Sequence, residues 1–174
     1  MFRFHPVCVL LIVALSVRVS GGECVFVEAE SFTDHGGWVL DTAFTQIVGS
    51  PYLLAHGLGK PVADAKTTVE ISRSGTYQVW VRTKDWVAPW KAPGTPGRFQ
   101  IAVDGRTLST TVGTEGADWH WQSGGSVQLN APQCQLALRD LTGFDGRCDA
   151  ILLSSDPDLT PPDGERLMAA RRQW

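Results

Sequence analysis

The stretch RFQIAVDG, which spans residues 98–105, decides the fold class of this chain. Residues 98–103 form a short run that contains Phe, Ile and Val and ends at a turn signal, a pattern typical of a β-strand. Asp104-Gly105 follows at once, and an Asp-Gly pair between two such runs is a strong signal for a tight hairpin turn. The partner run, residues 108–112, is rich in β-branched residues. The stretch therefore predicts two antiparallel strands joined by a tight turn.

Further short strands are expected on both sides of this hairpin. Each is a run of β-branched, aromatic or alternating residues that ends near Gly, Pro, Asp or Ser. They cover residues 24–30, 67–71, 76–83, 119–122, 126–129, 134–139 and 150–154. We therefore predict an all-β fold, an antiparallel jelly-roll β-sandwich. Two Gly- and Pro-rich segments, residues 34–64 and 86–97, resist assignment to strands and are expected to be ordered loops.

Residues 1–22 have the order of a secretory signal peptide. A basic start precedes an apolar run at residues 7–17, and small residues lead to Gly21 and Gly22. The run is shorter than the roughly 20 apolar residues that cross a bilayer. A membrane anchor and a buried first strand are the alternatives. We expect export to a secreted or periplasmic location, cleavage after Gly21 or Gly22, and no membrane contact afterwards.

The remaining chain is expected to contain one folded domain and a tail. The β-sandwich would span residues 23–156, and residues 157–174 would form a Pro-rich linker and a short helix that the chain end truncates. Residues 1–22 hold two arginines and no carboxylate, so their removal changes the net charge from −3 to −5. A mildly acidic domain lacks the long-range attraction that nucleic acid or an anionic membrane demands, so neither is expected as a partner.

Three cysteines remain after the predicted cleavage. Cys8 would leave with the signal peptide, and Cys24, Cys134 and Cys148 would stay. In an oxidising compartment, an odd number suggests one disulfide and one free thiol. No pair has the short spacing that structural zinc sites use.

The strongest functional signal is aromatic. The candidate ligand-binding residues are Trp86, Trp90, Lys84, Asp85, Lys91 and His120. Sugars present flat C–H faces that stack on aromatic rings, and hydroxyls that need paired donors and acceptors. A polar, aromatic-rich loop on a rigid sandwich supplies both. The sequence leaves open whether Trp86 and Trp90 bind a ligand or fold back as a hydrophobic lid.

Three other tryptophans are interpreted as packing residues. In a strand, Trp119 and Trp121 would point to one face and His120 to the other. One face of a sandwich strand is core, so both tryptophans are expected to pack there. Trp80 is expected in the core for the same reason.

Acidic residues form a second constellation. Glu28 and Glu30 lie two residues apart on the first strand and would share a face. A bound Ca²⁺ would compensate their charge, with Asp149 or Asp156 as further oxygen ligands. The alternative is a set of structural acids that accept backbone hydrogen bonds or pair with arginine.

Recognisable catalytic motifs are missing. The sequence has no GxSxG, HExxH, Walker or dinucleotide-binding glycine motif. Glu115, Asp118 and Asp85 could supply carboxylate pairs, but loop positions give no control over their separation. We therefore expect no catalysis by this chain alone.

Several motifs resemble galactose-binding-like jelly-roll modules. They are VEAESF at residues 27–32, GTYQVWVRT at residues 75–83 and CDAI at residues 148–151. Such modules occur in bacterial carbohydrate-active proteins, including xanthan lyases, and imply a polysaccharide or glycan partner. The resemblance also implies a structural calcium held by Glu28, Glu30 and Asp149.

A second resemblance covers nearly all of residues 23–174. GSPYLLAHG at residues 49–57, DWVAPWKAPG at residues 85–94 and GTEGADWHWQ at residues 113–122 resemble the N-terminal accessory region of secreted bacterial FAD-dependent oxidoreductases. The resemblance implies a flavin domain downstream of this chain, within the same gene. No flavin is expected to bind these residues themselves.

The jelly-roll resemblance also implies a disulfide. The first strand of such modules runs antiparallel beside the last, which would place Cys24 near Ser155. If residues 134–139 flank the last strand on its other side, Cys134 reaches the same end. A Cys24–Cys134 bridge would then be feasible, and Cys148 would stay free.

Overall fold

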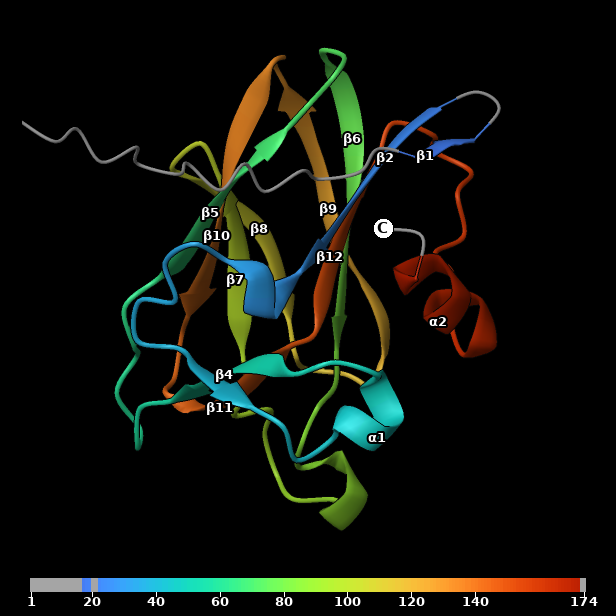
Figure 1. Ribbon diagram of the computed structural model, residues 1–174. Coiled ribbons are helices and arrows are strands. Elements are labelled where there is room, and N and C mark those ends of the chain that lie inside the picture. Colours follow the sequence, from blue (N-terminus) through green and yellow to red (C-terminus); the bar gives the residue numbers. More distant parts are fainter. Residues whose placement is uncertain (1–16, 20–21, 173–174) are drawn as a thin grey trace, which may run out of the picture.

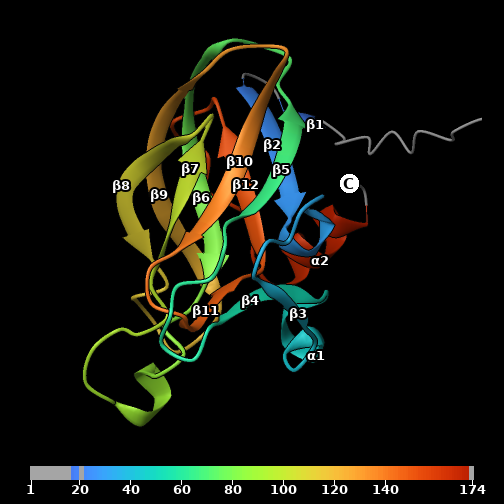
Figure 2. The same cartoon turned by 90° about the vertical axis from the view of Figure 1, so that its left-hand side faces the viewer.

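The computed structural model describes residues 17–19 and 22–172 and shows two facing antiparallel sheets (Figures 1 and 2). One sheet has the order β1 (Val17–Val19), β2 (Gly22–Glu28), β12 (Ala150–Ser154), β6 (Gly75–Thr83) and β9 (His120–Leu129). The facing sheet has the order β5 (Ala65–Glu70), β10 (Gln133–Asp140), β7 (Phe99–Val103) and β8 (Arg106–Val112). The predicted antiparallel jelly-roll β-sandwich is confirmed.

A small third sheet closes one end of the sandwich, at the bottom of Figure 1. It has the order β11 (Phe144–Cys148), β4 (Tyr52–His56) and β3 (Val39–Asp41). Two helices and two 3-10 turns complete the elements: α1 (Thr45–Val48), α2 (Glu165–Arg171), η1 (Ala29–Ser31) and η2 (Ala88–Trp90). The segment 34–64, expected as loop, therefore contains β3, α1 and β4.

Side-chain alternation builds the core between the two main sheets. Along β5 the buried positions are Ala65, Thr67 and Val69, and the residues between them are exposed. On the facing β6, Tyr77, Val79 and Val81 are all fully buried. Each such aliphatic side chain contributes about 1.5–3 kcal/mol when it leaves water, so this layer is the main source of stability.

The hairpin predicted from residues 98–112 is present. β7 pairs antiparallel with β8, and Val103 lies opposite Arg106. Asp104 and Gly105 both have left-handed backbone conformations, with φ of 48° and 79°. Positive φ at both central residues is what a two-residue turn between twisted strands requires.

The predicted Cys24–Cys134 disulfide is not formed. β2 does run beside β12, with Cys24 opposite Ser154, but the other neighbour of β12 is β6. β10, which carries Cys134, lies in the opposite sheet between β5 and β7. Cys24 consequently packs on the outer face of its sheet with Phe26, and Cys134 packs in the inter-sheet core. Both thiols are free, as is the buried Cys148.

The predicted signal peptide lies mostly outside the described residues. Within it, β1 pairs antiparallel with β2, Val17 opposite Cys24, and cleavage after Gly21 or Gly22 would remove that edge strand. None of the helices in residues 17–19 and 22–172 is long and apolar enough to cross a bilayer.

No position on the sandwich was predicted for the C-terminal helix, but the structure shows one. α2 lies against the outer face of the sheet that contains β2 and β12 (Figure 1). Leu167 is fully buried there with Phe26 and Leu152, and Trp80 and Trp121 pack at the margin. The indole N–H of Trp121 donates to the backbone oxygen of Pro162 at 2.7 Å, which ties the Pro-rich segment to the sheet.

Candidate functional site

The tryptophan loop leaves the end of β6 through two buried residues. The backbone N–H of Asp85 donates to the carbonyl oxygens of Glu115 and Gly116 at 3.0 and 2.9 Å. The Lys84 ammonium lies 5.1 Å from the centre of the Phe44 ring. Lys84 and Asp85 are only 9 % and 6 % exposed, so they anchor the loop and present little surface to a ligand.

Trp86 is a supporting residue of the loop. Its indole N–H donates to the backbone oxygen of Phe144 at 2.9 Å, and the Arg147 guanidinium lies 5.5 Å from the centre of its ring. Gly97 approaches the same ring so closely that an added Cβ would lie 2.9 Å from it. The position of Trp86 is therefore fixed by its contacts with Gly97 and with the distant Phe144 and Arg147.

Trp90 is the exposed aromatic residue of the loop. It ends the 3-10 turn η2, and its ring contacts Trp86 edge-on, with centres 6.2 Å apart. The residue is 71 % exposed, although burial of an indole is strongly favoured in general. The next residue, Lys91, is also exposed and has a left-handed backbone conformation. The sequence left open whether both tryptophans bind a ligand or fold back as a lid. In the structure Trp86 is half-buried and packs on the fold, whereas Trp90 faces solvent.

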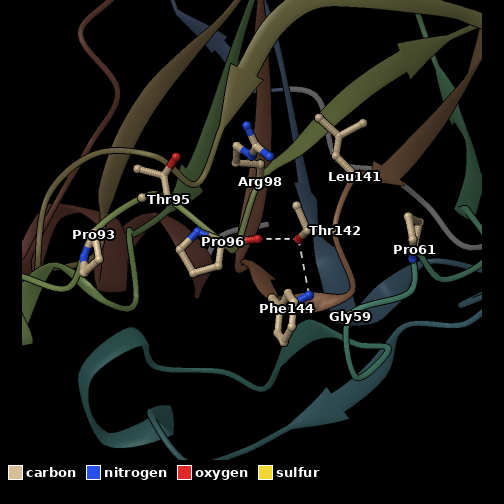
Figure 3. Close-up of a pocket in the computed structure, with 10 residues that line it drawn as sticks. Gly59, Pro61, Pro93, Thr95, Pro96, Arg98, Leu141, Thr142 and Phe144 are labelled. Carbon is tan, nitrogen blue, oxygen red and sulfur yellow. Dashed lines mark hydrogen bonds between the residues drawn. The ribbon is translucent and has the colours of Figure 1, made fainter.

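A cleft of about 500 Å³ lies beside the continuation of this loop. Its lining comes from three loops and from the start of β11 (Figure 3): Gly59, Pro61, Pro93, Gly94, Thr95, Pro96, Arg98, Leu141, Thr142 and Phe144. Apolar rings and an arginine thus surround one hollow, and its volume lies in the range that small-ligand sites have.

Hydrogen bonds hold the walls of the cleft together. The Thr142 hydroxyl donates to the backbone oxygen of Pro96 and accepts from the N–H of Phe144 (Figure 3). The buried Asp140 carboxylate accepts from the backbone N–H groups of Val62, Thr142 and Gly143 at 2.8–3.1 Å. One carboxylate therefore joins the loops on both sides, which gives the cleft a fixed shape.

The candidate residues from the sequence separate into three groups. Trp86, Trp90 and Lys91 share the loop, whereas Lys84 and Asp85 lie beneath it. His120 stands at the start of β9, half-buried, with its Nδ1 2.9 Å from the backbone oxygen of Asp118.

The expectation that Trp119 and Trp121 share one face of a strand is wrong. β9 begins only at His120, so Trp119 precedes the alternation and packs on Tyr52, with ring centres 4.9 Å apart. Trp121 packs on the outer face of its sheet, against Phe26. Trp80 is half-buried on that same outer face and lies outside the inter-sheet core.

Sequence reasoning missed Arg98, Leu141 and Phe144 of the cleft. Leu141 and Phe144 follow Arg98 by more than forty residues along the chain, and only the strand order brings them to it. One signal in the sequence could have indicated Phe144: it is an apolar residue directly after the turn residue Gly143. Phe144 is indeed exposed although it is apolar.

The acidic residues singled out by the sequence meet two arginines. Arg171 of α2 pairs with Glu28 and with Asp149 at 2.8 Å, and Arg82 pairs with Asp149 at 2.8 Å. Within the described part of the chain, no three acidic, histidine or cysteine side chains are grouped as metal ligands. Glu30 Oε2 is buried without a hydrogen-bond partner.

Burial governs the ionisation of the two glutamates. Burial raises the pKa of Glu28 to about 8, against the opposing effect of the Arg171 guanidinium. It raises the pKa of Glu30 to about 7, and the neighbouring Asp149 carboxylate adds to the rise. The raised pKa values mean that both glutamates hold their protons more tightly than an exposed glutamate does.

No family model matches the chain, and no curated protein matches it. Solved structures match at low identity. A family 35 carbohydrate-binding module from Clostridium thermocellum aligns over 75 % of this chain and 96 % of its own, with 19 % identity and a TM-score of 0.57. The family 35 module from Paenibacillus barcinonensis aligns over 75 % of this chain and 98 % of its own, with 18 % identity and a TM-score of 0.57.

A larger enzyme contains the same architecture. The GH26-CBM35 β-(1,4)-mannanase from Podospora anserina aligns over 80 % of this chain, with 19 % identity and a TM-score of 0.58. This chain spans only 29 % of that protein. At these identities the similarity shows a common fold, the jelly-roll sandwich of carbohydrate-binding modules.

Proposed function

We propose that this chain is a non-catalytic accessory module of a secreted bacterial protein and binds a polysaccharide through Trp90 and the adjoining cleft. The observation that carries the proposal is the exposed Trp90 ring, which rests on a fixed Trp86. An indole held open to solvent at the end of a rigid sandwich is a ready stacking surface for a sugar ring.

The cleft supplies the complementary polar contacts. Arg98 donates hydrogen bonds, and backbone and threonine groups around Thr95 and Thr142 offer further donors and acceptors. Phe144 and Leu141 add apolar surface for the C–H faces of a sugar. This combination of apolar walls and a few fixed polar groups is typical of small-ligand sites. The similarity to carbohydrate-binding modules supports the same function.

Affinity electrophoresis against soluble mannan, xylan and galactan tests the proposal. The unmodified protein should be retarded by at least one polymer. Trp90→Ala should weaken the affinity roughly thirtyfold, because loss of a central aromatic contact can cost about 2 kcal/mol of binding free energy. Trp90→Phe should keep most of it.

Leu40→Ala is the matched control, because Leu40 is an apolar residue of β3 with 52 % exposure. In Figure 2, β3 and the Trp90 loop lie on opposite sides of the lower end of the sandwich. Equal retardation of the Trp90→Ala and Leu40→Ala variants would contradict the role of the loop. Absence of retardation by every polymer would favour a structural or cell-surface interaction domain without a small ligand.

The attachment of this module to an FAD-dependent oxidoreductase is a finer part of the proposal. It rests on the sequence motifs at residues 49–57, 85–94 and 113–122. Reading the gene downstream of Trp174 tests it. A strand followed by a GxGxxG turn and a helix would support it, and a glycoside hydrolase domain or a stop codon would contradict it.

A further inference from the structure

We propose that the guanidinium of Arg171 is a built-in cation of this fold and takes the position between Glu28 and Asp149 where the jelly-roll resemblance implies calcium. The carboxylates on β2 and before β12 would then be neutralised by the C-terminal helix without a metal ion. Removal of that guanidinium would free the oxygens to bind Ca²⁺.

The Arg171 guanidinium lies against two carboxylates and one backbone oxygen. Nε and Nη2 lie 2.8 and 3.0 Å from the two carboxylate oxygens of Glu28. Nη2 also donates to Asp149 Oδ2 at 2.8 Å, and Nη1 donates to the backbone oxygen of Val48. Asp149 is fully buried, and the Arg171 side chain is only 8 % exposed. A planar guanidinium that bridges two carboxylates in this way is a strong, oriented ion pair.

The same contacts leave too few oxygens for calcium, although Glu30 Oε2 has no hydrogen-bond partner. Ca²⁺ takes six to eight oxygen ligands at about 2.3–2.6 Å. Both oxygens of Glu28 face Arg171, and Asp149 Oδ2 accepts from Arg82 as well, at 2.8 Å. Asp149 Oδ1 accepts the hydroxyl of Ser50 at 3.3 Å. The arrangement present does not fit a calcium ion while Arg171 is in place.

Packing of α2 sets the position of Arg171. Leu167 lies one turn earlier on α2 and is fully buried against the sheet, so Leu167 and Arg171 project from the same side of the helix. Met168 packs close to Gly49 at the end of α1. Apolar burial thus holds the helix at the site, and the ion pair fastens its last turn to β2 and to the start of β12.

Thermal unfolding with and without calcium tests this inference. The unmodified protein should have the same Tm in EGTA and in excess CaCl₂. Arg171→Met should lower the Tm in EGTA by roughly 10 °C, because one partner of a buried pair is lost. Added CaCl₂ should restore part of that loss in Arg171→Met. The control Arg172→Met, at an exposed neighbouring position, should behave as the unmodified protein.

Calorimetric titration of CaCl₂ into the unmodified protein gives a second measurement that does not depend on a variant. No binding heat is expected. Calcium binding by the unmodified protein, or a fall of its Tm in EGTA, would overturn the inference. An Arg171→Met variant as stable as the unmodified protein, or one with no response to calcium, would overturn it as well.

Discussion

At the residue scale, Glu23 shows how a carboxylate can fasten a strand without a cation. Its oxygens accept from the backbone N–H groups of Ser72 and Arg73 at 2.7 and 3.0 Å and from the Tyr77 hydroxyl. Burial alone would raise the pKa of Glu23, but these hydrogen bonds outweigh burial and hold the pKa below its ordinary value. Glu23 thereby joins β2 to the turn before β6.

A lowered pKa makes this contribution depend on pH. The unfolded chain binds the proton more readily than the folded one, so the stabilisation is present above the ordinary glutamate pKa. It disappears as the pH falls through the lower folded value. Glu23→Gln should reduce the free energy of unfolding by about 2 kcal/mol at pH 7 and by much less near pH 3. Urea unfolding at both pH values measures this, and an equal loss at both would contradict the account.

The residue scale also shows where sequence reasoning stops. The sequence placed Trp86 and Trp90 on a loop, which is correct, but it could not decide which indole stays exposed. That choice depends on Phe144 and Arg147, more than fifty residues away. The position of Asp85 depends in the same way on the loop that holds Glu115, and that of Lys84 on Phe44.

At the element scale, short strands bounded by turn signals were predictable, and the hairpin of β7 and β8, joined at Asp104-Gly105, is the clearest case. The segment 34–64 was not, because YLLAH in β4 does not alternate and lies between β3 and the distant β11 in a small separate sheet. The order of the strands within each sheet was equally unpredictable from the sequence, which is why β10 was expected beside β12.

The place of α2 left a signal in the sequence. β12 is buried along its whole length, and β2 is apolar from Cys24 to Val27. A strand that is apolar on both faces needs cover on both, as in sheets packed between two layers. The core covers one face of these strands, and α2 with the Pro-rich segment covers the other.

This cover predicts a stability effect for the helix. Leu167→Ala should lower the free energy of unfolding by about 2–5 kcal/mol, because a fully buried leucine is lost and a cavity remains. Chemical denaturation measures the change. Arg166→Ala, at an exposed position on the same helix, should change stability by less than about 0.5 kcal/mol. Equal effects of the two substitutions would mean that α2 does not pack on the sheet.

At the scale of the whole molecule, the first and last described elements, β1 and α2, lie away from the Trp90 loop. β1 is the edge strand of one sheet and α2 packs on the outer face of that sheet, whereas the Trp90 loop projects from the end formed by β4 and β11 (Figures 1 and 2). A module arranged in this way can be joined to another domain through its C-terminal region and still present the loop to a polymer.

The central claim, that a sugar binds at Trp90 and the adjoining cleft, is tested most directly by NMR. Soluble manno-, xylo- and galacto-oligosaccharides are titrated into the ¹⁵N-labelled protein. We predict that the largest shifts occur at the Trp90 indole N–H and at the backbone of residues 93–98 and 141–144. A groove between β8 and β9, of about 230 Å³ and lined by Arg106, Ser109 and Gln128 among others, is the competing surface. Shifts concentrated on that groove, or no shifts with any of the sugars, would contradict the account.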